Sequence, residues 1–164
     1  MFDIDFTKRA DYKLHVRKFF LYPDYWKDAN KSINIKLEWN AYEFSSRNRE
    51  NIPEEKGIYG FVLKPQYQNF FDTAYLFYFG KTNRTLKIRF QEYLDDQAGK
   101  GKPRPKVYEM LNLYRESLYF YFASIDSDKS ISECEEKVIN TFVPPINTDI
   151  PEARINPELR NIYE

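Results

Sequence analysis

Three short segments of the chain are rich in aromatic and β-branched residues. Residues 56–63 read KGIYGFVL, residues 74–80 read AYLFYFG, and residues 117–125 read SLYFYFASI. Runs of this length and composition, bounded by polar or turn residues, are typical of strands. We predict that the first two pair antiparallel across the polar connection between them and that the third is another strand of the fold.

Three other segments predict helices. The segment 82–94 carries apolar residues at helical spacing, as does 106–116, and the two apolar faces are Leu86, Phe90, Tyr93 and Leu94, and Val107, Met110, Leu111 and Tyr114. In the third segment, 130–142, Ser130 precedes Glu133 by three positions as a predicted capping box. The prolines after Val143 are expected to end this helix.

The first forty residues follow a looser pattern. Residues 7–30 are predicted as helix and turn, with Leu14, Phe19 and Phe20 on a helical stripe that Pro23 ends. Residues 32–39 alternate apolar and polar positions, which is the period of a half-buried strand. Further along the chain, residues 95–106 contain two glycines and two prolines and are predicted to form a loop.

The element order strand, strand, helix, helix, strand, helix favours an α+β fold, with a small three-stranded antiparallel sheet flanked by helices. At 164 residues the chain is expected to form one domain. We assign residues 51–150 to its body and residues 1–50 to an N-terminal helix and strand extension that packs on it. Residues 151–164 are expected to be a C-terminal tail.

Composition and charge narrow the classes of function. The 25 basic and 25 acidic side chains balance, but residues 81–116 carry nine and five and residues 126–164 carry four and nine. A basic face beside an acidic end is therefore permitted. One cysteine, Cys134, and one histidine, His15, exclude an internal disulfide and a zinc site of the usual kind. Without an apolar run of about eighteen residues or a secretory leader, we expect a cytoplasmic protein with no membrane partner.

Two tyrosines in the predicted hairpin are candidates for a shared site. Because side chains alternate along strands, Tyr59 and Phe61 point to one side of the sheet. Leu76 and Tyr78 are likewise expected to share a side, so the two tyrosines can lie on the same face. Gly80 follows directly, and a glycine there allows a tight bend or a close approach to a ligand.

Glu135 is the sharpest candidate on the last predicted helix. It lies four positions after Ile131 and four before Ile139, so it interrupts the apolar stripe that should face the protein. Glu136 should instead face water. A carboxylate directed inward is costly unless a cation or hydrogen-bond donors meet it, and Arg89 or a metal ion is the kind of partner it needs.

These tracts, taken in order, resemble the GIY-YIG nucleases, a superfamily that includes homing endonucleases, some restriction enzymes and the nuclease module of a bacterial excision-repair enzyme. The resemblance covers about residues 51–148, from GIY at 57–59 and YFGKT at 78–82 to PPINT at 144–148. The residues that match the motifs are Gly57, Tyr59, Tyr78, Gly80, Arg89, Glu135 and Asn147.

The resemblance implies metal-dependent hydrolysis of phosphodiester bonds in DNA, most naturally double-stranded DNA. Glu135 would bind one divalent ion, magnesium or alternatively manganese, and Arg89 would clamp the scissile phosphate. Tyr59 would position or deprotonate the attacking water, and Tyr78 would hydrogen-bond the phosphate or its water. Asn147 would order local structure or the waters of the metal.

Cations around these motifs are expected to contact the DNA, together with one tyrosine; these residues are Lys81, Arg84, Lys87, Tyr93, Lys102, Arg104 and Lys106. A phosphate contact of this kind contributes a salt-dependent part of the affinity. For the loop residues among them, the competing interpretation is an ordinary solvated surface loop.

The chain also departs from the family pattern. Its two motif tyrosines are nineteen positions apart, more than is common, so residues 64–74 are interpreted as an insertion. One extra residue separates Gly80 from Arg89, Tyr93 stands where many members have histidine, and Phe79 replaces the usual Ile or Val. Two other interpretations therefore stay open: a weak or inactive module that binds nucleic acid or a protein, and a small α+β domain that matches the motifs by accident.

Overall fold

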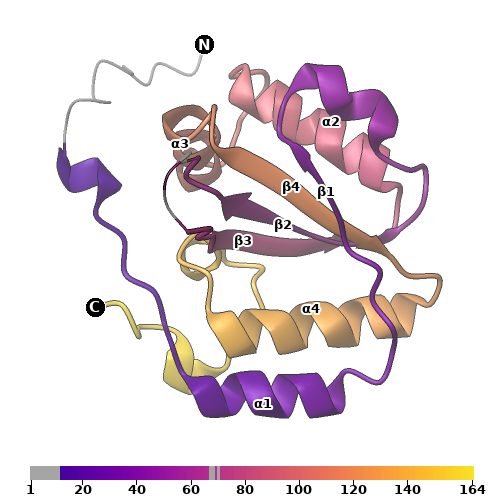
Figure 1. Ribbon diagram of the computed structural model, residues 1–164, viewed down its shortest axis with the longest axis vertical. Helices are drawn as coiled ribbons and strands as arrows, with labels where there is room; N and C mark the ends of the chain where they lie inside the picture. The colour runs from indigo at the N-terminus through magenta and orange to yellow at the C-terminus, as the bar shows by residue number, and fades with distance from the viewer. Residues whose placement is uncertain (1–11, 67–68, 70) are drawn as a thin grey trace.

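A four-stranded antiparallel sheet forms the centre of the computed structural model, which describes residues 12–66, 69 and 71–164 (Figure 1). Its strands are β1 (Asn40–Glu43), β2 (Gly57–Leu63), β3 (Tyr75–Thr82) and β4 (Leu118–Ser124), in the order β1-β4-β2-β3. The α+β class, the three predicted strands and the β2–β3 hairpin are confirmed. The expected total of three strands is wrong, because β1, from the N-terminal extension, pairs with β4.

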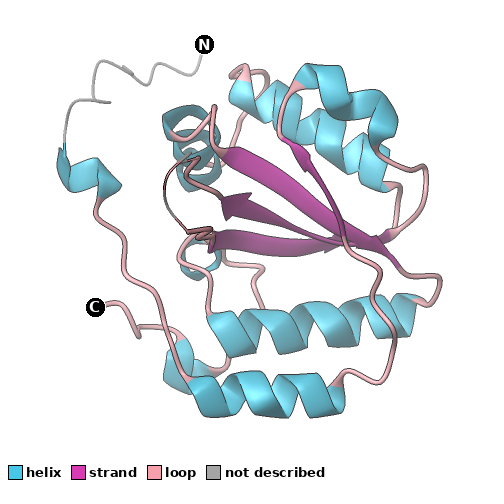
Figure 2. Cartoon of the chain, viewed as in Figure 1, coloured by secondary structure: helices cyan, strands magenta, loops and turns pink. Residues whose placement is uncertain are grey.

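Helices cover both faces of the sheet (Figure 2). They are α1 (Pro23–Ser32), α2 (Leu86–Gln97), α3 (Pro105–Leu113) and α4 (Asp128–Phe142), with short 3-10 turns η2 (Tyr12–His15), η3 (Ser46–Asn51), η4 (Asn147–Asp149) and η5 (Pro157–Leu159). Helices α2 and α3 lie on one face, and α4 lies on the other with α1 alongside it (Figure 1). In the described part of the chain, none of these helices has the length and apolar character needed to cross a membrane.

Each face of the sheet has its own hydrophobic core. The core under α2 and α3 is dominated by rings, among them Tyr59, Phe61, Phe90, Tyr93 and Phe120. The core under α4 is mainly aliphatic, and the C-terminal tail contributes Ile155 and Leu159 to it. The tail therefore packs as part of the domain.

A shift in register separates two side chains that were expected to lie together. Phe77 has no partner in the ladder between β2 and β3, so the alternation along β3 changes there. Phe77 and Tyr78 both enter the ring-rich core, whereas Leu76 packs on the opposite one. The prediction that Leu76 and Tyr78 share a side is therefore wrong, but Tyr59 and Tyr78 do lie on one face.

Helix α1 begins at the residue that was predicted to end a helix. Pro23 occupies its first turn, where the fixed backbone angle suits a helix and the missing N–H needs no partner. Of the predicted helical stripe, residues 12–15 form only the 3-10 turn η2, residues 16–22 are not helical, and residues 7–11 lie outside the described residues.

The segment 32–39 is not a strand, so that prediction is wrong. Its alternation of apolar and polar residues nevertheless identifies the side chains that face the aliphatic core. Ile33, Ile35 and Leu37 pack against the aliphatic core without ladder pairing. A period of two indicates an extended segment on an apolar surface, and this one precedes β1 instead of belonging to the sheet.

The start of α4 and the bounds of the predicted loop also differ from expectation. Ser127 caps α4, accepting a hydrogen bond from Ser130 N at 3.3 Å, so the proposed Ser130–Glu133 capping box is wrong. The helix ends as predicted, with Val143 in the left-handed region at φ 42°. The predicted loop 95–106 narrows to residues 98–104, and residues 67, 68 and 70 of the insertion lie outside the described residues.

Candidate active site

Five of the seven residues matched to the nuclease motifs line one cavity of about 300 Å³. Tyr59 and Tyr78 come from β2 and β3, Arg89 from α2, Glu135 from α4 and Asn147 from the turn η4. These elements are far apart in the sequence, and the sheet with its flanking helices brings them together.

Two glycines allow the strands to approach as the site requires. Gly80 lies directly opposite Tyr59 in the ladder, and a Cβ atom there would lie 2.8 Å from the Tyr59 hydroxyl and 3.0 Å from the Tyr78 hydroxyl. Both hydroxyls therefore use the space that the missing side chain leaves. A Cβ at Gly57 would lie 2.1 Å from the carbonyl oxygen of Ala123, so only glycine fits beside β4.

The Arg89 guanidinium is held by three side chains. Its Nε donates to the Tyr59 hydroxyl at 2.8 Å, Nη2 donates to the Tyr93 hydroxyl at 3.3 Å, and Nη1 bonds Glu92 at 2.7 Å. Burial by itself would lower the pKa of Arg89, but the neighbouring phenols and Glu92 raise it above its usual value. This side chain is a permanently charged, oriented cation.

A second guanidinium approaches the same phenols. Arg104 Nη2 donates to the Tyr93 hydroxyl at 3.2 Å, and its guanidinium carbon lies 5.6 Å from the centre of the Tyr78 ring. Tyr93 is fully buried in the cluster, with its hydroxyl 3.0 Å from that of Tyr59. The expected contact of Tyr93 with DNA stays a prediction, and in this geometry its hydroxyl connects the two arginines to Tyr59.

Counting donors and acceptors fixes which way the hydroxyl protons point. A phenol has one proton and two acceptor lone pairs, and an arginine only donates. The Tyr93 oxygen accepts from Arg89 and Arg104, so its own proton is directed to Tyr59. The Tyr59 oxygen then accepts from Tyr93 and Arg89, and its own proton is left to donate to a ligand in the cavity.

Tyr59 is also held in its neutral form. Burial raises the pKa of Tyr59 well above its usual range and the neighbouring Tyr78 adds to this, while Arg89 and Tyr93 offset only part of the effect. Burial likewise raises the pKa of Tyr93. The geometry therefore favours positioning by Tyr59 over removal of a proton from water.

Glu135 is directed inward, as expected. Its side chain is 16% exposed and that of Glu136 is 51% exposed. Glu135 Oε2 lies 3.0 Å from Lys81 Nζ, which also donates to Ser132 Oγ at 3.0 Å. The sequence indicated Arg89 or a metal ion as the partner of this carboxylate. Its ion-pair partner in the structure is Lys81, the residue that follows Gly80.

A hard divalent ion is the kind of metal that this donor set suits. No group of three or more acidic, histidine or cysteine side chains gathers at one point within the described ranges. Glu135 offers one carboxylate at the cavity wall, and magnesium is commonly held by one or two carboxylates together with phosphate oxygens and waters. Glu135 can therefore bind such an ion when a phosphate shares the cavity.

Asn147 holds β3 in place. It is buried, its Oδ1 accepts from the Phe79 N–H at 2.8 Å, and its Nδ2 donates to the Phe79 carbonyl at 2.8 Å. The amide thus behaves like a neighbouring strand for the residue between Tyr78 and Gly80. Of the two roles expected for Asn147, the ordering of local structure is the one this geometry supports.

The remaining predicted DNA contacts are spread around the cavity. Arg84 lines an adjoining hollow of about 260 Å³ together with Lys81 and Arg89. Lys87 forms ion pairs with Glu50 and Glu54. Lys102 and Lys106 are exposed outside the cavity.

Sequence reasoning included Arg104 among the cations that contact DNA but did not place it inside the cavity, where it reaches the phenols. It missed the C-terminal tail as part of the site, and the tail adds Glu152, Ala153 and Arg154 to the wall. Nothing in the periodicity of the tail marks it as part of a site. For Arg104 the available signal was its place between two prolines, which restrict the backbone on both sides.

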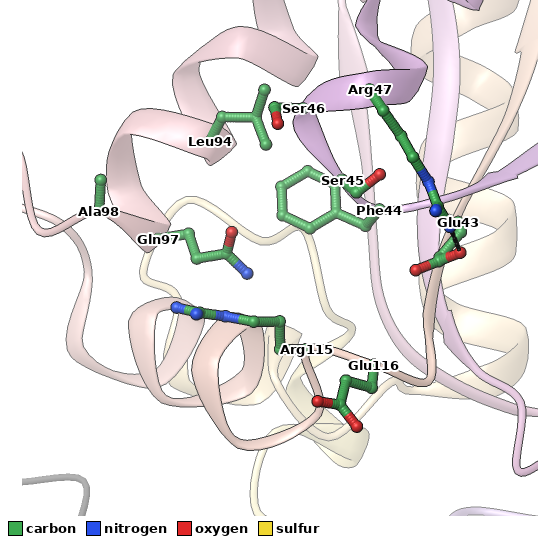
Figure 3. A pocket seen from close by; sticks show the side chains of 10 residues that line it. All are labelled: Glu43, Phe44, Ser45, Ser46, Arg47, Leu94, Gln97, Ala98, Arg115 and Glu116. Atoms are coloured by element: carbon green, nitrogen blue, oxygen red, sulfur yellow. Dashed lines mark hydrogen bonds and ion pairs between the residues drawn. The ribbon is translucent and has the colours of Figure 1, made fainter.

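A larger cavity of about 530 Å³ lies elsewhere, between β1, η3 and the end of α2 (Figure 3). Its lining includes Phe44, Leu94 and Gln97, and Arg47 forms an ion pair with Glu43 beside it. None of the motif residues lines it, so we place the chemistry in the smaller cavity.

Comparisons with known proteins add no further assignment, because no protein-family model, no curated protein and no solved structure matches this chain.

Proposed function

We propose that the protein is a metal-dependent endonuclease that hydrolyses phosphodiester bonds of double-stranded DNA at a single-metal site of the GIY-YIG type. The observation that carries the proposal is the convergence of Tyr59, Tyr78, Arg89 and Glu135 on one cavity. The cavity is lined by four cationic and two acidic side chains. Such a surplus of positive charge suits a phosphate ligand.

Arg89 binds the phosphate in this proposal. Its contacts with Tyr59, Tyr93 and Glu92 fix the plane of the guanidinium and leave N–H groups on both terminal nitrogens. A planar cation presents donors to a phosphate at a set geometry. Because these donors are oriented before substrate arrives, they stabilise the charge that develops on the phosphate during hydrolysis.

Tyr59 acts as a neutral hydrogen-bond donor to the phosphate or to the water held against it. Its two lone pairs are occupied by Arg89 and Tyr93, and burial raises its pKa, so the phenol keeps its proton and is not available as a base. Tyr78 lines the same cavity on the strand next to Tyr59. The attacking water would therefore be held by these hydroxyls. As its oxygen bonds to phosphorus and the bond to the leaving oxygen breaks, its proton would pass to a phosphate oxygen and not to Tyr59.

Glu135 would hold the divalent ion, most naturally magnesium. When bound, such an ion would supply Lewis-acid stabilisation of the leaving oxygen and of the negative charge on the phosphate oxygens. Lys81, at 3.0 Å, holds the carboxylate at the cavity wall and can move to a phosphate oxygen when the carboxylate binds a metal. Gly80 and Asn147 position the strand that carries Tyr78.

The ion pair between Lys81 and Glu135 also favours a second candidate function. An ammonium at 3.0 Å neutralises the carboxylate and competes with a metal for it. If that pair persists with DNA bound, the protein is a nucleic-acid-binding module without hydrolytic activity.

Nicking of supercoiled plasmid with magnesium separates these functions. We expect the wild type to nick, Glu135→Gln to lose at least about a hundredfold in rate through loss of the metal ligand, and Glu136→Gln to match the wild type. Glu136 is the matched control because it is the adjacent carboxylate on the solvent side of α4. If wild type and Glu135→Gln behave alike, the enzymatic proposal fails.

A further inference from the structure

Arg104 stands apart from the other cations of the cavity. Lys81 pairs with Glu135 at 3.0 Å, Arg89 pairs with Glu92 at 2.7 Å, and even Arg154 lies 3.9 Å from Glu136. Among the described residues, no carboxylate lies within ion-pair distance of the Arg104 guanidinium, whose partners are phenols.

The backbone holds Arg104 in place. It lies between Pro103 and Pro105, with φ −65° and ψ 127°, and is the residue before the first turn of α3. Its carbonyl accepts the backbone N–H of Tyr108 at 2.9 Å. The side chain is directed into the cavity by this fixed turn and by its contact with Tyr93, so little conformational freedom is left to lose on binding.

Its charge has phenols and no carboxylate as partners. The side chain is partly buried, and although burial acts to lower the pKa of Arg104, Tyr93 and Tyr78 raise it above its usual value, so the side chain stays charged. A partly buried cation without a paired anion is costly, and an anionic ligand would relieve that cost.

Arg89 and Arg104 are placed to act together. Each donates to the same oxygen, the Tyr93 hydroxyl, from within 3.3 Å, and both line the cavity. A group the size of a phosphate, with several acceptor oxygens, can therefore contact both guanidinium groups at once.

We propose that Arg104 is a second phosphate-binding residue of the site, which clamps the same DNA phosphate as Arg89 from the other side of Tyr93. This inference rests on the proposed function for the identity of the ligand. It goes beyond the sequence expectation, in which Arg104 is one of several cations that contact the DNA.

Binding measured without metal tests the proposal independently of hydrolysis. The variants are Arg104→Gln, Arg104→Lys and, as control, Arg47→Gln, an exposed arginine outside the cavity that is not assigned to DNA binding. Fluorescence anisotropy with a labelled DNA duplex in EDTA gives affinity as a function of salt. We expect Arg104→Gln to lose about tenfold in affinity and about one unit of salt slope, and Arg47→Gln to lose no more than about twofold.

Inorganic phosphate serves as the second probe. At matched ionic strength, phosphate should raise the melting temperature of the wild type and of Arg47→Gln more than chloride does, but not that of Arg104→Gln. If Arg104→Gln is poorly folded, the DNA affinity of Arg104→Lys tests the proposal, because lysine keeps the positive charge but lacks the planar guanidinium. Arg104→Lys should bind DNA more weakly than the wild type.

Wild-type DNA affinity and a wild-type phosphate shift in the folded Arg104 variants would overturn the inference. Absence of plasmid nicking by the wild type would overturn the endonuclease proposal alone, since the binding measurements contain no metal.

Discussion

Substitution of Gly80 by alanine is the most direct test of how the strands build the site. The added Cβ would lie 2.8 Å from the Tyr59 hydroxyl and 3.0 Å from the Tyr78 hydroxyl, whereas ordinary contact begins at 3.4 Å. The Tyr59 ring has little room to retreat, because it stacks on Phe120 at 5.3 Å and its hydroxyl is bonded to Tyr93. Either the strand or both phenols must shift by a few tenths of an ångström.

The magnitude follows from two effects. Overpacking of a buried position costs about 1–3 kcal/mol, which for a domain of this size lowers the melting temperature by about 2–12 °C. A retreat of Tyr59 also stretches its 2.8 Å bond with Arg89, the group proposed to bind phosphate. Because misplacement of such a group is expensive, we expect the nicking rate to fall by about tenfold to a hundredfold.

Gly60→Ala is the matched control in the neighbouring strand. Its Cβ would meet Leu76, Phe79 and the Tyr78 carbonyl, each at 3.1 Å, but no hydroxyl of the site. We expect this variant to lose some stability in thermal unfolding and to keep its nicking rate within about threefold after correction for the folded fraction. A Gly80→Ala protein with wild-type melting temperature and rate would refute the reasoning.

Two further predictions concern the buried polar groups. Asn147→Ala removes both hydrogen bonds to the buried Phe79 backbone and should lower the free energy of unfolding in urea by about 2–4 kcal/mol. The control Thr148→Ala removes one partly buried hydroxyl hydrogen bond and should lower it by about 1 kcal/mol or less. Equal losses of stability in the two variants would contradict the positioning role of Asn147. The pKa values of Tyr59 and Tyr93 are raised in the folded state, so as the pH rises the unfolded chain releases these phenol protons first. The stability that the two neutral phenols contribute is therefore present below about pH 10 and is lost above it. Above that pH the free energy of unfolding should fall by up to about 1.4 kcal/mol per pH unit for each phenol. In thermal melts followed from about pH 8 to pH 11, Tyr59→Phe should lose stability less steeply than the wild type. Identical slopes for the two proteins would contradict the burial of the Tyr59 phenol.

The strongly periodic parts of the chain were predictable from sequence. Strands β2, β3 and β4 are dense in aromatic and β-branched residues, and α2, α3 and α4 carry apolar residues at three- and four-residue spacing, so local pattern and tertiary burial agree. The inward direction of Glu135 followed from the same spacing.

Other features depend on contacts that local pattern does not encode. The extra residue Phe77 reverses the side on which Leu76 lies, and only the register with β2 reveals it. Pro23 is equally suited to follow one helix or to begin another, and the packing of α1 along α4 decides. Likewise, Arg104 is one of several loop cations in the sequence, and its contact with Tyr93 arises only when α2 and α3 pack together.

We propose that Glu135, Arg89 and the phenols surround one site for a divalent ion and a phosphate. Anomalous diffraction from crystals soaked in manganese, with and without a short DNA duplex, measures this directly. We predict an anomalous peak at the Glu135 carboxylate inside the cavity, strongest with DNA bound and absent from Glu135→Gln crystals. Manganese found only at exposed carboxylates, with Lys81 still paired to Glu135 in the DNA complex, would contradict the account.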